Sequence, residues 1–89
     1  MLSHDFEEES EILKALANPT RLRLLMCLLD VECNVSNLQK KLGIPQSTVS
    51  QHIRVLRNKK IIKGERNGSV IIYRVIDNRV EEIIKALQK

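Results

Sequence analysis

The chain has 89 residues, of which 43% are apolar and 2% aromatic, and its formal net charge at pH 7 is +4. This length predicts a single small domain, residues 1–89, with a marginal core of leucine, isoleucine and valine that association with a second copy would reinforce. The longest apolar run, residues 24–29, is far shorter than the roughly 20 residues of a membrane-spanning helix, which argues against a membrane-embedded protein.

The lysines and arginines are concentrated in one part of the chain. Residues 40–74 contain nine of the 15 basic residues and one acid, Glu65, whereas residues 1–11 contain five of the 11 acids and no lysine or arginine. A basic segment of this kind is typical of proteins that bind a polyanion. The alternative is an ordinary solvated surface, and charge alone does not separate the two.

The start of the chain is acidic and lacks the basic and apolar regions of a secretory signal. In such a chain Cys27 and Cys33 are expected to be reduced thiols, and the protein is expected to be cytoplasmic. The sequence contains no glycine-rich phosphate loop and no nucleophile with an ordered base, so we expect neither an enzyme nor a bound cofactor.

Two helices are predicted in the first third of the chain. Residues 3–17 carry an incomplete apolar stripe, with acids in the first turns where they suit the helix dipole. Asn18 and Pro19 are typical of a helix start, and a second helix follows to about residue 30. Apolar residues surround most of its circumference, so we predict that it is the central buried helix.

A short third helix is predicted over residues 35–43, with Ser36 and Gln39 at capping-box spacing and Gly43 at its end. After a three-residue turn, a fourth helix is predicted over residues 46–58. Two short helices joined by a turn that contains glycine indicate a helix-turn-helix.

The pattern changes after residue 60. Two β-rich runs flank Asn67 and Gly68, which predicts a hairpin. Asn78 and Glu81 then have the spacing that caps a last helix. The predicted order is helix, helix, helix-turn-helix, hairpin, helix.

The fourth predicted helix has two distinct faces. Val49, Ile53 and Leu56 have the spacing of a core face. A second face is polar, and residues 44–60 contain no acid that would repel a phosphate. The second helix of a helix-turn-helix lies in the DNA major groove, which makes this face a predicted DNA-binding surface. Its candidate DNA-binding residues are Gln46, Ser47, Thr48, Ser50, Gln51, His52, Arg54 and Arg57.

The residue types on this face suit base recognition. The amides of Gln46 and Gln51 match the N6/N7 edge of adenine, and the serine hydroxyls both donate and accept. The side chain of Arg54 is long enough to bond a guanine edge or a phosphate. His52 has two open interpretations, a contact with DNA or a hydrogen bond within the fold. An ordinary amphipathic surface helix is the alternative for the whole segment.

The predicted hairpin has a small, polar and basic tip. This tip suits a phosphate backbone or a minor groove, where contacts give position and affinity more than sequence choice. A hairpin that only covers the core is the alternative. The candidate DNA-binding residues of the tip are Arg66, Asn67, Gly68 and Ser69.

Three segments together resemble the ArsR/SmtB family of bacterial winged-helix repressors. They are LKALANPTRLRLL at residues 13–25, IPQSTVSQHIRVLRNKKII at 44–62 and GERNGSVIIYRV at 64–75. The resemblance implies a mainly α winged helix-turn-helix with a β-hairpin wing, in the order α-α-α-α-β-β-α. It also implies a homodimer formed by the first and last helices, bound to an inverted repeat in double-stranded DNA. The residues then expected at the dimer interface are Ile12, Leu13, Leu16, Val80, Ile83, Ile84 and Leu87.

The sequence departs from the family in the residues that sense a signal. Metal-sensing members often carry a Cys-Val-Cys element, and the matching positions here hold Asn34 and Ser36. A second family site uses ligands on the last helix, where Glu81 and Glu82 alone are poor ligands for a soft or borderline metal. We therefore expect no metal site.

Cys27 and Cys33 are the redox candidates. Members of the family that sense sulfide or oxidants are expected to pair a cysteine on the second helix with one on the last helix, which has none here. Three alternatives remain open: inert thiols, a local bridge if the α-carbons lie within about 7 Å, or a regulator without a small-molecule inducer. The sequence leaves the effector, protein or small molecule, unidentified.

The function expected is a dimeric, sequence-specific repressor of transcription. A thiol- or metal-responsive repressor of the same fold is one alternative. A winged-helix module that binds protein and not DNA is another, which the basic segment 40–74 disfavours.

Overall fold

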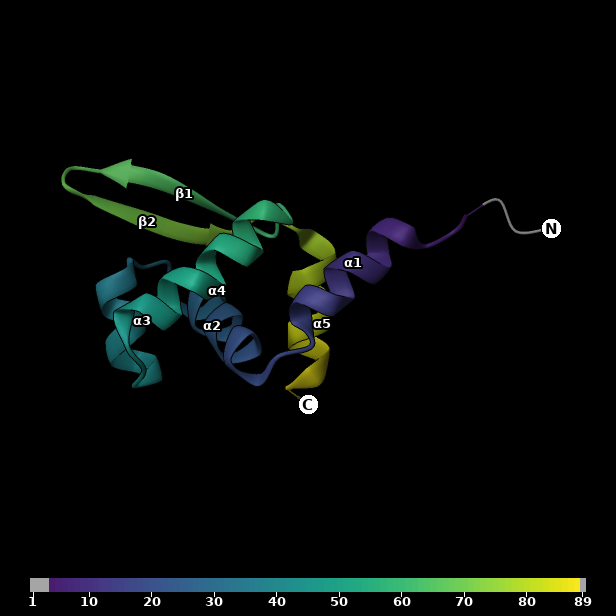
Figure 1. Ribbon diagram of the computed structural model, residues 1–89, viewed down its shortest axis with the longest axis horizontal. Coiled ribbons are helices and arrows are strands. Elements are labelled where there is room, and N and C mark those ends of the chain that lie inside the picture. Colours follow the sequence, from purple (N-terminus) through teal and green to yellow (C-terminus); the bar gives the residue numbers. More distant parts are fainter. Residues whose placement is uncertain (1–3, 89) are drawn as a thin grey trace.

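The computed structural model describes residues 4–88, which form five helices and one hairpin in the predicted order (Figure 1). The elements are α1 (Glu7–Leu16), α2 (Pro19–Asp30), α3 (Val35–Leu42), α4 (Gln46–Asn58), β1 (Ile62–Asn67), β2 (Val70–Val75) and α5 (Asn78–Leu87). The predicted fold class, a winged helix-turn-helix, is confirmed. Within residues 4–88, no helix is long and apolar enough to cross a membrane.

The first helix is shorter than predicted. Its predicted start at Ser3 lies outside the described residues, and α1 begins at Glu7. Phe6 precedes it with a left-handed backbone, at φ 60°. Because a right-handed helix cannot continue through that conformation, α1 cannot extend back past Phe6.

Side-chain caps set the starts of three helices. The Asn18 carboxamide accepts hydrogen bonds from the backbone N–H groups of Thr20 and Arg21, at 2.9 and 3.1 Å, as predicted for α2. For α3 and α5 the predicted caps, Ser36 and Asn78, were wrong. Asn34 accepts from the backbone N–H of Asn37 at 2.8 Å, and Asp77 accepts from those of Arg79 and Val80. Both capping residues have the extended backbone that a cap requires, whereas Ser36 and Asn78 already lie inside their helices.

The core surrounds α2, as predicted. Leu24, Leu25 and Leu28 are buried, and α1, α3, α5 and β2 all contact this helix. In Figure 1, α1 and α5 lie at one end of the molecule, and α3 and the hairpin lie at the other. Most of the buried side chains are leucine, isoleucine and valine, as the composition indicates.

The hairpin turn lies one residue later than predicted. Asn67 pairs with Val70, so the two-residue loop consists of Gly68 and Ser69. Gly68 has φ 66°, while the backbone of Ser69 does not have a positive φ. A single positive φ at the first loop position is the requirement of a type II′ turn, which explains why glycine occupies that position.

Tyr73 fixes the base of the hairpin to the helices. Its backbone N–H donates to the carbonyl of Cys33, in the loop between α2 and α3, at 2.9 Å. Its ring lies over Gly64 of the opposite strand, where an added Cβ would approach the ring to 2.8 Å. A larger residue at position 64 would therefore displace Tyr73, which is buried.

The α4 helix ends in a Schellman motif. Ile61 donates its backbone N–H to the carbonyl of Leu56, and Lys60 donates to that of Arg57, at 3.0 and 2.9 Å. Lys60 holds the left-handed position of this motif, with φ 58°. Glycine is the preferred residue there, because a side chain in this conformation costs about 1 kcal/mol.

We therefore expect Lys60→Gly to raise the free energy of unfolding by about 1 kcal/mol. Denaturant unfolding monitored by circular dichroism measures this change. Lys60→Ala is the matched control, because it removes the same charged side chain but keeps the Cβ that makes φ 58° costly. A loss of stability in Lys60→Gly equal to that of the control would contradict a conformational cost at Lys60.

Candidate nucleic-acid interface

The α4 helix is held against the core by one side. Val49, Ile53 and Leu56 are buried, as predicted from their spacing. A tight turn of Gly43, Ile44 and Pro45 joins α3 to α4, and Gly43 adopts φ 68° at the end of α3. The opposite side of α4 is consequently turned to solvent, and it lies at the front in Figure 1.

The solvent-facing side of α4 holds most of the predicted contact residues. These residues combine amide, hydroxyl and guanidinium groups, and residues 44–60 contain no acid. Serine, glutamine and arginine side chains on such a face are free to reach base edges and phosphates. The exposed residues of this set are Gln46, Ser47, Ser50, Gln51, Arg54 and Arg57.

Thr48 and His52 lie on a different, half-buried flank of α4. The Nδ1 atom of His52 accepts a hydrogen bond from Nε of Arg21, on α2, at 3.1 Å. Of the two interpretations of His52, the structure therefore shows the hydrogen bond within the fold. Burial, and then the charge of Arg21, hold the pKa of His52 below its usual value.

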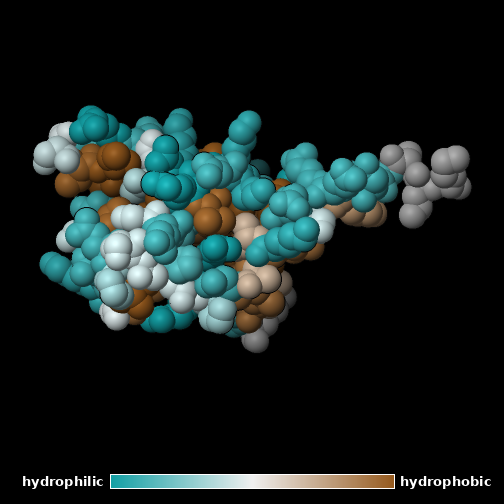
Figure 2. All heavy atoms as spheres, in the orientation of Figure 1, coloured by the Kyte–Doolittle hydropathy of each residue, from teal (hydrophilic) through white to brown (hydrophobic). Residues whose placement is uncertain are grey.

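The hairpin carries its predicted contact residues at its far end. The predicted tip residues Arg66, Asn67, Gly68 and Ser69 are all exposed. Val70 and Ile71 beside them are also exposed, and Figure 2 shows a hydrophobic cluster at this part of the hairpin. The sequence does not single out these two residues, because a strand pattern alone does not tell which of its apolar side chains stay exposed.

The residues predicted for a dimer interface fall into two groups. Ile12, Leu16, Val80 and Ile84 are buried within the single chain. The other three reach the surface: Leu13 is 52% exposed, Leu87 is 63% exposed, and Ile83 is half-buried.

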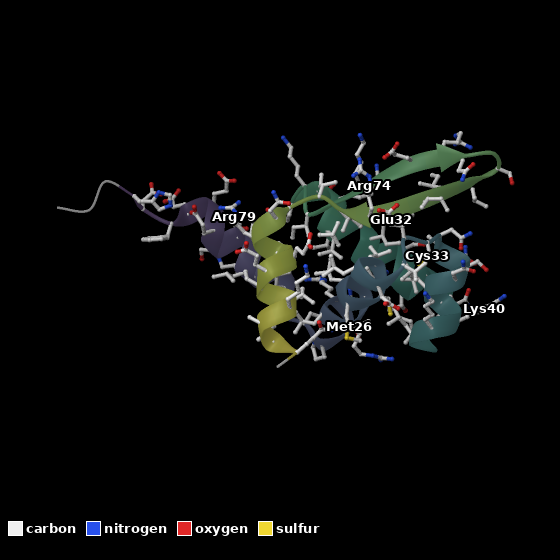
Figure 3. All side chains as sticks on the ribbon, turned by 180° about the vertical axis from the view of Figure 1, so that it is seen from behind. Met26, Glu32, Cys33, Lys40, Arg74 and Arg79 are labelled. Carbon is white, nitrogen blue, oxygen red and sulfur yellow. The ribbon has the colours of Figure 1, made fainter. Side chains whose placement is uncertain are left out.

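Met26 is a further exposed apolar residue near Leu87, which the sequence pattern does not predict. Met26 is 41% exposed and lines a shallow groove between α2 and α5, together with Leu22, Ile84 and Leu87. Figure 3 shows it beside the C-terminal part of α5. The all-round apolar pattern of α2 hid this exposed position.

Both cysteines are free thiols, in different surroundings. Cys27 is half-buried and lines a groove between α2 and α5. Cys33 is buried at the base of the hairpin, and this burial raises the pKa of its thiol. Figure 3 shows Cys33 between the helices and the strands. Within residues 4–88, no three His, Cys, Asp or Glu side chains are grouped so that they could hold a metal ion.

The polar face of α4, its support by α3 and the adjoining hairpin define a class of protein. This class is the winged helix-turn-helix DNA-binding regulators. A family model described as "Bacterial regulatory protein, arsR family" matches residues 18–63. The chain belongs to this family, which confirms the resemblance found in the sequence.

Relatives align over nearly the whole chain. An uncharacterized HTH-type transcriptional regulator of Methanocaldococcus jannaschii, MJ1325, is 35% identical, over 94% of this chain and 96% of the relative. The transcriptional repressor PagR of Bacillus anthracis is 40% identical, over 91% and 82%. Its crystal structure superposes with a TM-score of 0.84, covering 92% of this chain and 94% of that one. HlyU from Vibrio cholerae N16961 superposes with a TM-score of 0.89 at 30% identity, over 97% and 94%.

We expect the burial of His52 beside Arg21 to make stability depend on pH. Because the pKa of His52 is lowered in the folded state, the unfolded chain binds a proton at a higher pH. This contribution to the free energy of unfolding is complete above the unfolded pKa of about 6.5 and is lost as the pH falls through the folded pKa. His52→Asn, which keeps an acceptor and does not titrate, should flatten this part of the profile in denaturant unfolding. Parallel pH profiles of His52→Asn and the unchanged protein would contradict a contribution from His52.

We also expect the two thiols to react at different rates. The buried Cys33 with its raised pKa should react with a thiol reagent at least about tenfold more slowly than Cys27 in the folded protein. Mass spectrometry of labelled peptides measures the two rates, and labelling in urea is the control in which they should converge. Faster labelling of Cys33 than of Cys27 in the folded state would contradict the burial argument.

Proposed function

We propose that this chain is a transcriptional repressor that binds a specific sequence in double-stranded DNA. The observation that carries the proposal is the exposed, acid-free polar face of α4, held in place from behind by three buried residues. The helix is thus fixed to the core on one side and free to enter a major groove on the other. Membership of the ArsR family and the repressor PagR as a relative support the proposal.

The contacts divide into two kinds. Gln46, Gln51 and Arg54 have the groups that read base edges, so they should set sequence choice. Arg66 and the small residues at the hairpin tip suit the sugar-phosphate backbone, so they should set affinity and position. Substitutions on α4 should therefore change sequence choice, and substitutions at the hairpin tip should change affinity for all sequences.

The proposed active form is a homodimer. Leu13, Met26 and Leu87 remain exposed on α1, α2 and α5, where burial of large apolar side chains would be favourable. A two-fold dimer would present two copies of α4, and its operator would be an inverted repeat. We propose that the protein acts in the cytoplasm, where it binds DNA. We propose no catalytic activity.

Selection of binding sites from randomised duplex DNA tests this function. The protein is used reduced, at near-physiological salt, and an inverted repeat is expected among the recovered sequences. Recovery of single half-sites would contradict the dimer. Recovery of nothing above background, from reduced and oxidised protein alike, would contradict DNA recognition and favour a protein-binding module.

We expect Gln51→Ala to relax sequence choice. The substitution removes a bidentate amide from the exposed face of α4, so affinity for the selected operator should fall roughly 5- to 100-fold. Affinity for unrelated duplex should stay nearly unchanged, because phosphate contacts remain. Fluorescence anisotropy with both duplexes measures the two affinities, and Asn78→Ala, which removes an exposed amide from the start of α5, is the control. An equal loss on both duplexes would contradict the role of Gln51.

A further inference from the structure

A third face of α4 lies between its core face and its exposed polar face. Thr48, His52, Val55 and Lys59 share this flank, because they recur at intervals of three and four residues. Two of them contact other helices through polar groups. His52 accepts a hydrogen bond from Arg21, and the Nζ of Lys59 donates to the carboxylate of Glu11, on α1, at 3.1 Å.

Arg21 joins three helices at one point. Its Nε donates to His52 on α4 at 3.1 Å, and one of its terminal nitrogens donates to the carbonyl of Ala15, in the last turn of α1, at 3.3 Å. Its own backbone N–H is bound by the Asn18 cap at the start of α2. Arg21 is therefore held at its backbone by the cap and at its guanidinium by His52 and the carbonyl of Ala15.

The contacts of α4 make such a fixed point important. The helix packs chiefly on α3 and β1, through Val49, Ile53 and Leu56. Apolar packing is not directional, so it resists separation of the helix more than a small rotation about its axis. Side-chain ends lie roughly 5 Å from a helix axis, so a rotation of about 15° would move them by more than 1 Å. A hydrogen bond has strict distance and angle limits, and the bond at His52 restrains that rotation.

We infer that Arg21 is a positioning residue for DNA recognition: by holding His52 it fixes the rotation of α4, and so the direction in which Gln51 and Arg54 face the bases. This inference rests on the proposed function. Sequence-specific binding needs base-reading groups in register, whereas non-specific phosphate binding tolerates displacement. Loss of the Arg21 link should therefore weaken operator binding and leave non-specific binding nearly intact.

The test uses the operator recovered by selection and an unrelated duplex. Arg21→Gln and His52→Ala should each lower operator affinity by about tenfold, within the range of one base-reading contact, with little change on unrelated DNA. In the double variant the two effects should not add, because both substitutions break the same link. His52→Asn, which places an amide oxygen near the position of Nδ1, should restore most of the operator affinity.

The matched control is Arg23→Gln. Arg23 lies one half-turn away on the same helix, and it donates to the carbonyl of Leu42 at the end of α3, not to α4. The substitution Arg23→Gln removes the same charge as Arg21→Gln and also one interhelical hydrogen bond. Arg23 also lines the groove with Met26 and Leu87, so analytical ultracentrifugation checks that this variant assembles like the unchanged protein, and circular dichroism at the assay temperature shows whether each variant is folded. With assembly unchanged, its operator affinity should stay near that of the unchanged protein.

Salt dependence separates positioning from a direct phosphate contact. A positioning role leaves the slope of log affinity against log salt unchanged in Arg21→Gln, whereas loss of one phosphate contact reduces its magnitude by about 0.9. A reduced slope, additive effects in the double variant, or an equal loss in Arg23→Gln would each overturn the inference. Failure of the unchanged protein to select any operator would overturn the proposed function instead, so the two failures are distinct.

Discussion

Burial of the α2 leucines is the interaction on which the rest of the structure depends. Leu24, Leu25 and Leu28 are covered from several sides, because α1, α3, α5 and β2 all pack on this helix. The α4 helix is held mainly by α3 and β1. Its buried residues belong to the same core, and polar links connect this helix to α2, through Arg21 and His52, and to α1, through Glu11 and Lys59.

The acidic start of the chain contributes to these links. Arg79, at the start of α5, lies within 3.9 Å of Glu8 and 3.5 Å of Glu9, and Figure 3 shows it beside α1. Glu11 pairs with Lys59 of α4 at 3.1 Å. Exposed ion pairs of this kind contribute little individually, on the order of 0–1 kcal/mol, and salt screens them. Their effect is to orient α1 toward α4 and α5, which the charge pattern of the sequence alone does not reveal.

The sequence predicts best where two independent signals agree. The bounds of α2 and α4 follow from the Asn-Pro start and from clear apolar periodicity. The caps of α3 and α5 were assigned to the wrong residues, because several short polar side chains stand near each start and only the backbone shows which one is extended. The predicted interface residues include both buried and exposed side chains for another reason. The apolar stripes of α1 and α5 pack on the chain's own core, and the pattern of a stripe does not show which of its side chains remain exposed.

The attachment of the hairpin at Tyr73 has a mechanical consequence. The strands continue beyond the Cys33–Tyr73 contact, and the free part of the hairpin ends at Gly68 and Ser69. At roughly 3.4 Å per residue, the tip stands more than 10 Å from this support. A tilt of about 5° about Tyr73 would therefore move the tip by about 1 Å. In the proposed complex with DNA, such a tip would follow grooves of different width, whereas α4 would require one geometry.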